Sequence, residues 1–271
     1  TVVHDEARSW IRRSDRKFDL IQATLVDTWA ATAAGAFALS ENALYTVEAF
    51  EDYWNHLTEG GVVHFTRWHR EPPRESLRTL ALMVEVMKRN GIADPAQHIL
   101  VTMDPLGLRE GGAVYASLIW SKQPFDAARL AKLRAWGDDR VKADPTLTMV
   151  PVCAPGLVPI DDLGRFLAAA DKEAFIAAYP YDVRPTTDDR PFFFNSVRLT
   201  DVVTFRTETY PNEQAVVVLV TVLITVTGIV LLAFGLPFLF AFRRIKAESG
   251  RGTGLRLLYF CGLGIGFMLV E

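Results

Sequence analysis

The chain has 271 residues, of which half are hydrophobic and 23% are charged, and its formal net charge is −3. This composition is typical of a globular protein and excludes a disordered chain. The small net charge, without a basic stripe interleaved with aromatic residues, gives no indication of a nucleic-acid partner.

Apolar runs rich in β-branched residues predict four strands, near residues 18–25, 61–67, 97–103 and 113–121. Only a loop separates the last two, which predicts an antiparallel pair. Helical spacing predicts helices over residues 7–13, 45–57, 77–90 and 124–136, one or two more over 160–178, and an extended piece at 147–152. The pair Gly60-Gly61 is expected to break the second helix. This alternation predicts an α/β fold with a mainly parallel sheet and helices on both faces.

The first residues, Thr1 to His4, read as the end of a strand, so we expect the front of the domain to be missing. In sheets of this kind ligands bind at the carboxyl ends of the strands. The loops after Val3 and after Leu25 are therefore the predicted places for chemistry.

The first loop contains Asp5, Glu6 and Ala7. A carboxylate at the end of a strand can accept hydrogen bonds from a sugar or from an adenine amino group. The alternative is that Asp5 or Glu6 caps the following helix, where the helix dipole favours an acid.

The second loop begins at Asp27 and continues with small residues as far as Gly35. An aspartate there could bind an amine or act as a general base, or simply cap a connection.

The five histidines show no metal-ligand spacing, so we predict no metal site and interpret them as surface or core residues. Residues 185–195 (PTTDDRPFFFN) are interpreted as a surface turn followed by a strand or a docking segment, with a functional site as the alternative.

A run of 28 residues without charge, Ala215 to Phe242, predicts a transmembrane helix, since about 20 apolar residues span a bilayer. We expect a bend near Gly235–Pro237, and a second helix over 255–271 that is cut off by the chain end. Gly262 and Gly266 are spaced for close helix contact, compatible with a homo-oligomer.

The predicted domains are residues 1–200 and a membrane region, 201–271. Cys153 and Cys261 fall on opposite sides of this boundary, which excludes a disulfide framework.

With these residues the chain resembles the polyamine aminopropyltransferases, the spermidine synthase family, and above all its bacterial membrane-fused members. The resemblance runs without a gap from Glu6 to Asp27. Glu6-Ala7 stands where the family has the acid that contacts the adenine of decarboxylated S-adenosylmethionine, and Asp27 matches the second Asp of its Asp-x-x-Asp loop. Further matches are FDLI at 18–21, LYTVEAF at 44–50, Gly60-Gly61, DDRPFFF and the closing GLGIGFMLVE.

The resemblance implies a nucleoside-methyltransferase-like (Rossmann-type) fold, truncated at its N-terminus. It implies S-adenosylmethionine or its decarboxylated form as substrate, bound by Asp5, Glu6 and Ala7, with no metal. The catalytic position would be Asp27 with Thr24, but Thr24 replaces the family's proton acceptor, the first Asp of that loop. A threonine hydroxyl is not a base near neutral pH without a partner. The family's Gln-containing segment is also replaced, by Thr66-Arg67-Trp68-His69.

The expected function is a membrane-anchored transferase that binds an S-adenosylmethionine-type nucleoside, with an amine or an unknown acceptor. The alternative is a non-catalytic domain that senses a nucleoside or polyamine for an attached membrane protein or transporter. The expected location is the bacterial inner membrane. The five basic residues between 243 and 256 favour a cytoplasmic loop there, which would put the soluble domain outside. A nucleoside ligand favours a cytoplasmic domain, and we give that argument the greater weight.

Overall fold

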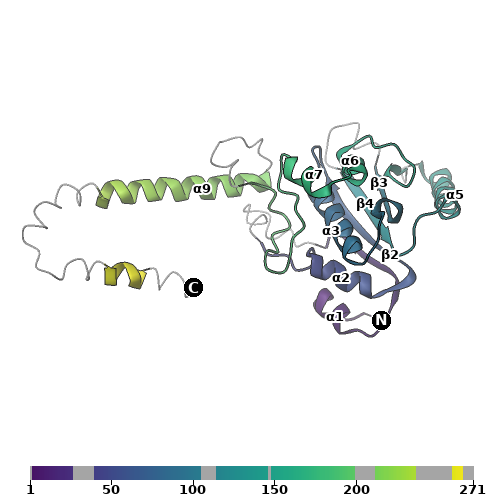
Figure 1. Cartoon of the computed structure of the whole chain (residues 1–271), viewed down its shortest axis with the longest axis horizontal. Helices are drawn as coiled ribbons and strands as arrows, with labels where there is room; N and C mark the ends of the chain where they lie inside the picture. Colours follow the sequence, from purple (N-terminus) through teal and green to yellow (C-terminus); the bar gives the residue numbers. More distant parts are fainter. Residues whose placement is uncertain are drawn as a thin grey trace, which may run out of the picture. The chain divides into compact units, whose positions relative to one another are not determined.

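The structure, a computed structural model, describes residues 2–26, 40–104, 114–145, 148–198, 211–235 and 258–264. The chain divides into two compact units, Thr1–Val217 and Val218–Glu271. The first unit is a mixed α/β domain (Figure 1). It carries every candidate site residue that the structure describes.

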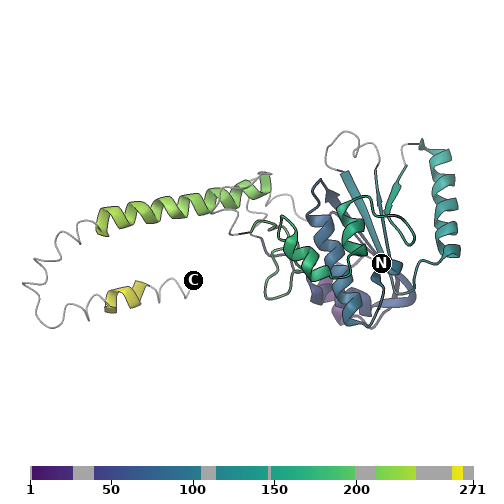
Figure 2. The same cartoon turned by 45° about the horizontal axis from the view of Figure 1, so that its top comes forward.

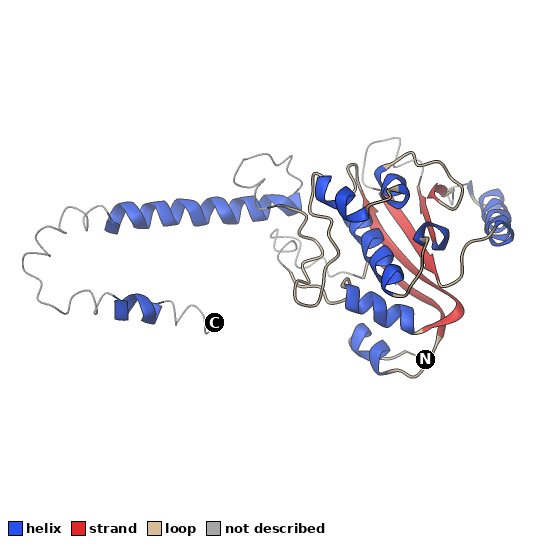
Figure 3. Ribbon diagram, in the orientation of Figure 1, coloured by secondary structure: helices blue, strands red, loops and turns tan. Residues whose placement is uncertain are grey.

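The first unit is built on a five-stranded sheet with the order β1-β2-β4-β3-β5 (Figure 3). The strands are β1 (Phe18–Thr24), β2 (Leu57–His69), β3 (Ile99–Met103), β4 (Val114–Ser121) and β5 (Val150–Cys153). The β1–β2 pair is parallel, and the other three pairs are antiparallel. The predicted antiparallel pairing of the strands near 97–103 and 113–121 is therefore confirmed.

The expectation of a mainly parallel sheet is met only in part. Three of the five strands point in one direction, but only one of the four pairs of neighbouring strands is parallel. β1, β2 and β3 point the same way, while β4 and β5 point the opposite way. Because β4 follows β3 through a short connection, it returns antiparallel and takes the place between β2 and β3.

Helices α2 and α3 pack on one face of this sheet and bury the core, whereas α5 lies on the other side (Figure 2). The helices of this unit are α1 (Ala7–Arg13), α2 (Val47–Asn55), α3 (Glu75–Arg89), the 3-10 turn η3 (Pro95–His98), α5 (Ala127–Ala143), α6 (Asp162–Ala168) and α7 (Lys172–Ala178). In the core, Phe50 of α2 stacks on Phe65 of β2, with ring centroids 4.8 Å apart. α5 buries no residue at all, so the two faces of the sheet are covered very unequally.

Gly60 and Gly61 do not break the chain as expected, since β2 runs through both. A Cβ atom on Gly61 would lie 2.8 Å from the carbonyl oxygen of Phe18, where the register of the β1–β2 pair shifts. Glycine is needed there because the two backbones approach so closely. Val2 to His4, expected to end a strand, are not in a strand, and Val2 is almost fully exposed.

The segment from Asp182 to Ser196 docks against the helical layer, which confirms the docking interpretation of the phenylalanine-rich motif. Phe193 and Phe194 are buried, and the Phe193 ring stacks on Tyr45 at 4.4 Å. The guanidinium of Arg78 donates to four backbone carbonyls of this segment, those of Asp182, Phe192, Phe193 and Asn195. Burial lowers the pKa of Arg78 to about 10, so the group still carries its charge at neutral pH.

The second unit contains most of α9 (Pro211–Val230), followed by the π-helical turn η5 (Leu231–Gly235) and by a helical stretch at 258–264. The predicted helix over 215–242 thus begins earlier than expected. A bend was expected near Gly235–Pro237, and Pro237 lies outside the described residues, as do the rest of 236–242 and residues 265–271. Within the described ranges, the structure contains no helix that meets both the length and the hydropathy required to cross a membrane.

Candidate functional site

Glu6 caps helix α1. Its two carboxylate oxygens accept hydrogen bonds from the backbone amides of Arg8 (3.0 Å) and Ser9 (2.7 Å). Burial alone would raise the pKa of Glu6, but these hydrogen bonds outweigh burial and hold the pKa below its usual value. The helix-capping alternative is therefore confirmed, and the cap leaves Glu6 ionised.

Asp5 and Ala7 occupy the turn on either side of Glu6. One oxygen of Asp5 accepts from the Glu6 amide at 2.8 Å, and the other lies 2.5 Å from Arg13 Nη2. Such exposed ion pairs contribute little to stability. Ala7 is the first residue of α1 and is exposed. The structure thus places the three predicted nucleoside-binding residues together at the start of α1.

Arg8, for which the sequence suggested no role, joins this turn to the rest of the domain. Its guanidinium donates to both oxygens of Asp188 at 2.7 Å, to the carbonyl oxygen of Ala43 at 3.1 Å and to Asp52 at 3.4 Å. The hydrogen bonds from Arg8 hold the pKa of Asp188 below its usual value. The sequence carried only a weak signal that Arg8 is buried. Arg8 lies three residues before Ile11, which places the two side chains on the same face of α1.

Thr24 ends β1, at the edge of the sheet where β1 and β2 both have their carboxyl ends. Its hydroxyl oxygen accepts from Gln22 Nε2 at 3.1 Å and from the Thr66 hydroxyl at 3.4 Å. Neither partner is a base, so these contacts do not make up for the missing carboxylate. Asp27, predicted to lie beside Thr24, is outside the described residues.

The chain turns sharply directly after Thr24. Leu25 has a φ of +45°, in the left-handed region that residues with a side chain rarely adopt. Such conformations cost about 1–3 kcal/mol and are found preferentially at functional sites. The strained residue follows the candidate catalytic position and precedes the loop that begins at Asp27.

His64, interpreted from sequence as a surface or core residue, lies on the same side of the sheet as Thr24. Its Nε2 is 2.7 Å from the hydroxyl of Ser117 on β4 and 3.5 Å from the hydroxyl of Thr66. Burial lowers the pKa of His64 below its usual value of 6.5. The imidazole is therefore neutral at physiological pH and can either accept or donate a hydrogen bond.

A second histidine cluster lies at the end of β2. His69 Nδ1 is 2.9 Å from Ser76 Oγ, and its Nε2 is 3.1 Å from Glu71 Oε1. Ser76 is fully buried, so its hydroxyl cannot reach a substrate. We interpret these hydrogen bonds as structural, because they hold the turn between β2 and α3 against the end of β2.

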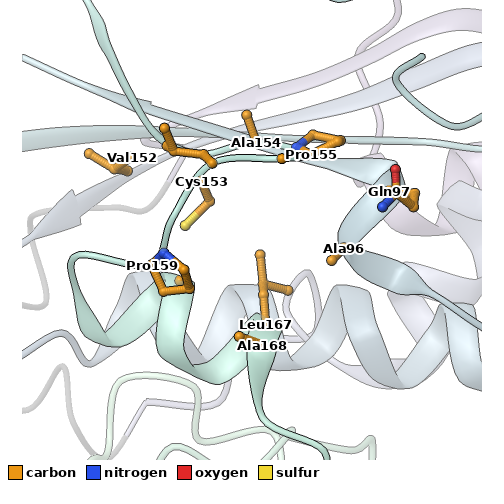
Figure 4. Close-up of a pocket in the computed structure, with 12 residues that line it drawn as sticks. Ala96, Gln97, Val152, Cys153, Ala154, Pro155, Pro159, Leu167 and Ala168 are labelled. Carbon is orange, nitrogen blue, oxygen red and sulfur yellow. The ribbon is translucent and has the colours of Figure 1, made fainter. Parts of the chain in front are cut away.

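A small cavity of about 110 Å³ lies between η3, β5 and α6 (Figure 4). The Cys153 side chain faces it, together with Leu167 and Pro159. Burial raises the pKa of the Cys153 thiol, which therefore stays protonated and is a poor nucleophile. Typical ligand pockets have volumes of ~300–1,000 Å³, so this cavity is too small for a nucleoside.

Over the part of the chain that the structure describes, no cluster of three potential metal ligands is present.

Comparison with protein-family models and with curated proteins gives no match. Among solved structures, the chain is similar to one described as a probable spermidine synthase from Corynebacterium glutamicum, with 18% sequence identity and a TM-score of 0.43. The similarity covers 62% of this chain and 51% of that protein, so the chain spans about half the length of that structure.

Proposed function

We propose that this chain carries a transferase domain of the spermidine synthase type, which binds an S-adenosylmethionine-type nucleoside and is anchored to a membrane by its C-terminal residues. The observation that carries the proposal is the order in which the matching segments fall on the fold. Glu6 caps α1, FDLI lies in β1, LYTVEAF leads into α2, and Gly60-Gly61 lies in β2, parallel to β1.

The geometry supports a ligand at the carboxyl ends of β1 and β2, where α/β sheets bind small molecules. In the proposed reaction an amine nitrogen attacks a carbon bonded to the sulfonium of decarboxylated S-adenosylmethionine. A C–N bond forms, the C–S bond breaks with its electron pair going to sulfur, and the nitrogen must lose a proton. The family uses a carboxylate for that proton, and here Thr24 stands in its place.

The contacts of Thr24 favour a second candidate, a binding domain without efficient catalysis. In the described structure Thr24 hydrogen-bonds with Gln22 and Thr66 rather than with a base. Arg8, beside the candidate adenine-binding acid Glu6, is also tied to Asp188 in the segment that precedes α9. A nucleoside bound near Glu6 could thereby affect the C-terminal residues, as expected of a sensing domain.

For the membrane part, we propose that residues 215–242 and 255–271 anchor the chain in the bacterial inner membrane, with the α/β domain in the cytoplasm and with contacts between copies through Gly262 and Gly266. The apolar, charge-free composition of 215–242 supports this proposal. Protease treatment of sealed inverted vesicles is the test. Cleavage of the α/β domain from outside is expected, and protection would contradict the cytoplasmic assignment.

The function itself is tested with the purified full chain, decarboxylated S-adenosylmethionine and putrescine, by following both nucleoside binding and spermidine formation. Binding with slow turnover that Thr24→Asp accelerates supports the transferase, and binding without turnover in either form supports the sensing domain. Absence of nucleoside binding would contradict both candidates.

A further inference from the structure

The face of the sheet opposite α2 and α3 is poorly covered within the described residues. On this face, Leu20 is 52% exposed and Tyr115 is 43% exposed. α5 lies on this side but buries none of its residues (Figure 2). Arg129 of α5 reaches only the far end of the face, where it donates to Ser121 and to the carbonyl oxygen of Gly60.

Four hydroxyl side chains form a row across the middle of this face. Thr24 of β1 is in register with Thr66 of β2, Thr66 with Ser117 of β4, and Ser117 with Thr102 of β3. Residues directly opposite in neighbouring strands point to the same face, so the four hydroxyls share it. With neighbouring strands ~4.8 Å apart, this hydroxyl row is about 14 Å long.

Hydrogen bonds connect three of the four hydroxyls, those of Thr24, Thr66 and Ser117, into one polar surface. Thr66 donates to Thr24 at 3.4 Å, and His64 bridges Thr66 and Ser117 at 3.5 and 2.7 Å. Gln22 adds an amide group beside Thr24 at 3.1 Å. Hydroxyl, amide and neutral imidazole groups can each donate or accept hydrogen bonds.

An aromatic pair borders the hydroxyl row on the side of the carboxyl ends of β1 and β2. Trp68 and Tyr115 are in register, two residues beyond the Thr66–Ser117 pair, and their ring centroids are 4.4 Å apart at an interplanar angle of 32°. The exposed part of Tyr115 offers an aromatic surface next to the hydroxyls.

Within the paired stretches of the four strands, the side chains on this face carry no formal charge; Asp104 follows β3 directly, and Arg129 lies at the far end of the face. From Leu20 to Thr24, Val62 to Trp68, Leu100 to Thr102 and Tyr115 to Ile119, the residues on this face are hydroxyl, amide, imidazole, apolar or aromatic. A phosphate or a polyamine would find no counter-charge among these described residues. A sugar ring fits better, because its hydroxyls both donate and accept, and its C–H face packs against aromatic rings.

We propose that the hydroxyl row is a binding site for an uncharged sugar ring, whose vicinal hydroxyls bond to Thr66, His64 and Ser117 while the ring lies against Tyr115. Cross-strand hydroxyl pairs also stabilise sheets, but that role requires neither a face that the described residues cover poorly nor an aromatic border. The sugar can belong to a free carbohydrate or to the ribose of a nucleoside. Only the second source connects this site with the proposed transferase.

The test is binding of methyl glucoside, adenosine and putrescine to the full chain, measured by saturation-transfer NMR. The variant is the double substitution Thr66→Val with Ser117→Ala. Thr58→Val is the matched control, because Thr58 is a threonine of the same strand about 26 Å away at ~3.3 Å per residue. Each lost hydrogen bond is expected to weaken binding by about three- to tenfold.

We expect at least one sugar-bearing probe to bind the wild type and the Thr58→Val variant, and to bind the double variant at least about tenfold more weakly. Thr66→Ser, which keeps the hydroxyl, should bind as the wild type does and exclude a folding defect as the cause. Binding of adenosine but not of glucoside would identify a ribose, and binding of both would identify a general sugar site. Failure of both probes, equal binding by the double variant, or preference for putrescine would overturn the proposal. If the wild type binds glucoside but does not bind decarboxylated S-adenosylmethionine added as a further probe, the proposed function alone is contradicted.

Discussion

Arg8 and Asp188 are 180 positions apart in the chain, yet both terminal nitrogens of Arg8 donate to both carboxylate oxygens of Asp188 at 2.7 Å. Asp188 also accepts from the Thr46 hydroxyl at 2.7 Å, and its own amide donates to Glu48. One ion pair thus joins α1, the start of α2 and the docked segment before α9. Bidentate pairs of this kind are among the stronger hydrogen-bonded contacts in proteins.

Asp188→Asn is therefore expected to lower the free energy of unfolding by about 1 kcal/mol, because the largely buried Arg8 loses a charged acceptor, while solvent around the 43% exposed Asp188 side chain weakens the pair. The measurement is urea unfolding followed by circular dichroism. Asp189→Asn is the matched control, since it removes the same charge at an exposed neighbouring position. Equal effects of the two substitutions would contradict a specific role for the pair.

Glu6 has two separable roles in this account, capping α1 and binding the nucleoside. Glu6→Ala should cost about 1 kcal/mol of stability through loss of the cap. Glu6→Gln keeps an acceptor oxygen and should cost less, yet it removes the carboxylate that is proposed to contact adenine. Thermal unfolding and nucleoside binding measured on both variants separate the roles. If Glu6→Gln binds the nucleoside as tightly as the wild type, Glu6 is only a cap.

Thr24→Asp is expected to raise spermidine formation, because it restores a carboxylate where the proton must be accepted. General-base catalysis contributes ~10²–10⁴-fold in rate, so the wild type should be slow by a comparable factor. Spermidine formation is measured under single-turnover conditions, with Thr24→Val as the control that removes the hydroxyl without adding a base. Turnover by the wild type in the usual enzymatic range would show that the proton goes elsewhere.

His64 should titrate below its usual value of 6.5, because burial disfavours its charged form. In the unfolded chain the imidazole takes up a proton near pH 6.5, and in the folded chain only at lower pH. The unfolded state thus binds more protons in this window, and stability falls as the pH drops through 6.5 towards the folded pKa. NMR titration of the imidazole gives the midpoint, and His64→Gln should remove this part of the acid sensitivity. A midpoint above 6.5 would contradict the burial argument.

Local sequence signals predicted the local structure well. The helix Ala7–Arg13 has the expected bounds, and the two helices α6 and α7 lie within the expected range. α5 begins later than expected because Asp126 caps it, with its carboxylate accepting from the Arg129 amide at 2.7 Å. These features depend on neighbours in the chain, which periodicity and capping rules describe.

Long-range features were not predictable in the same way. Gly61 looked like a helix breaker because its contact with the Phe18 carbonyl depends on the pairing of β1 with β2. The hydroxyl row requires the register of four strands, and the Arg8–Asp188 pair requires the docking of a distant segment. Of the candidate site, the sequence placed Glu6 and Thr24 on the right elements, but it missed Arg8 and His64. Their partners Asp52, Ser117 and Asp188 lie 44 to 180 residues away.

The central claim is that the α/β domain binds an S-adenosylmethionine-type nucleoside, and isothermal titration of the full chain with decarboxylated S-adenosylmethionine tests it most directly. We predict saturable binding at one site per chain, weakened at least about tenfold by Glu6→Gln, in line with the loss of one charged hydrogen bond. No saturable binding at millimolar nucleoside, by a chain shown to be folded, would contradict the account.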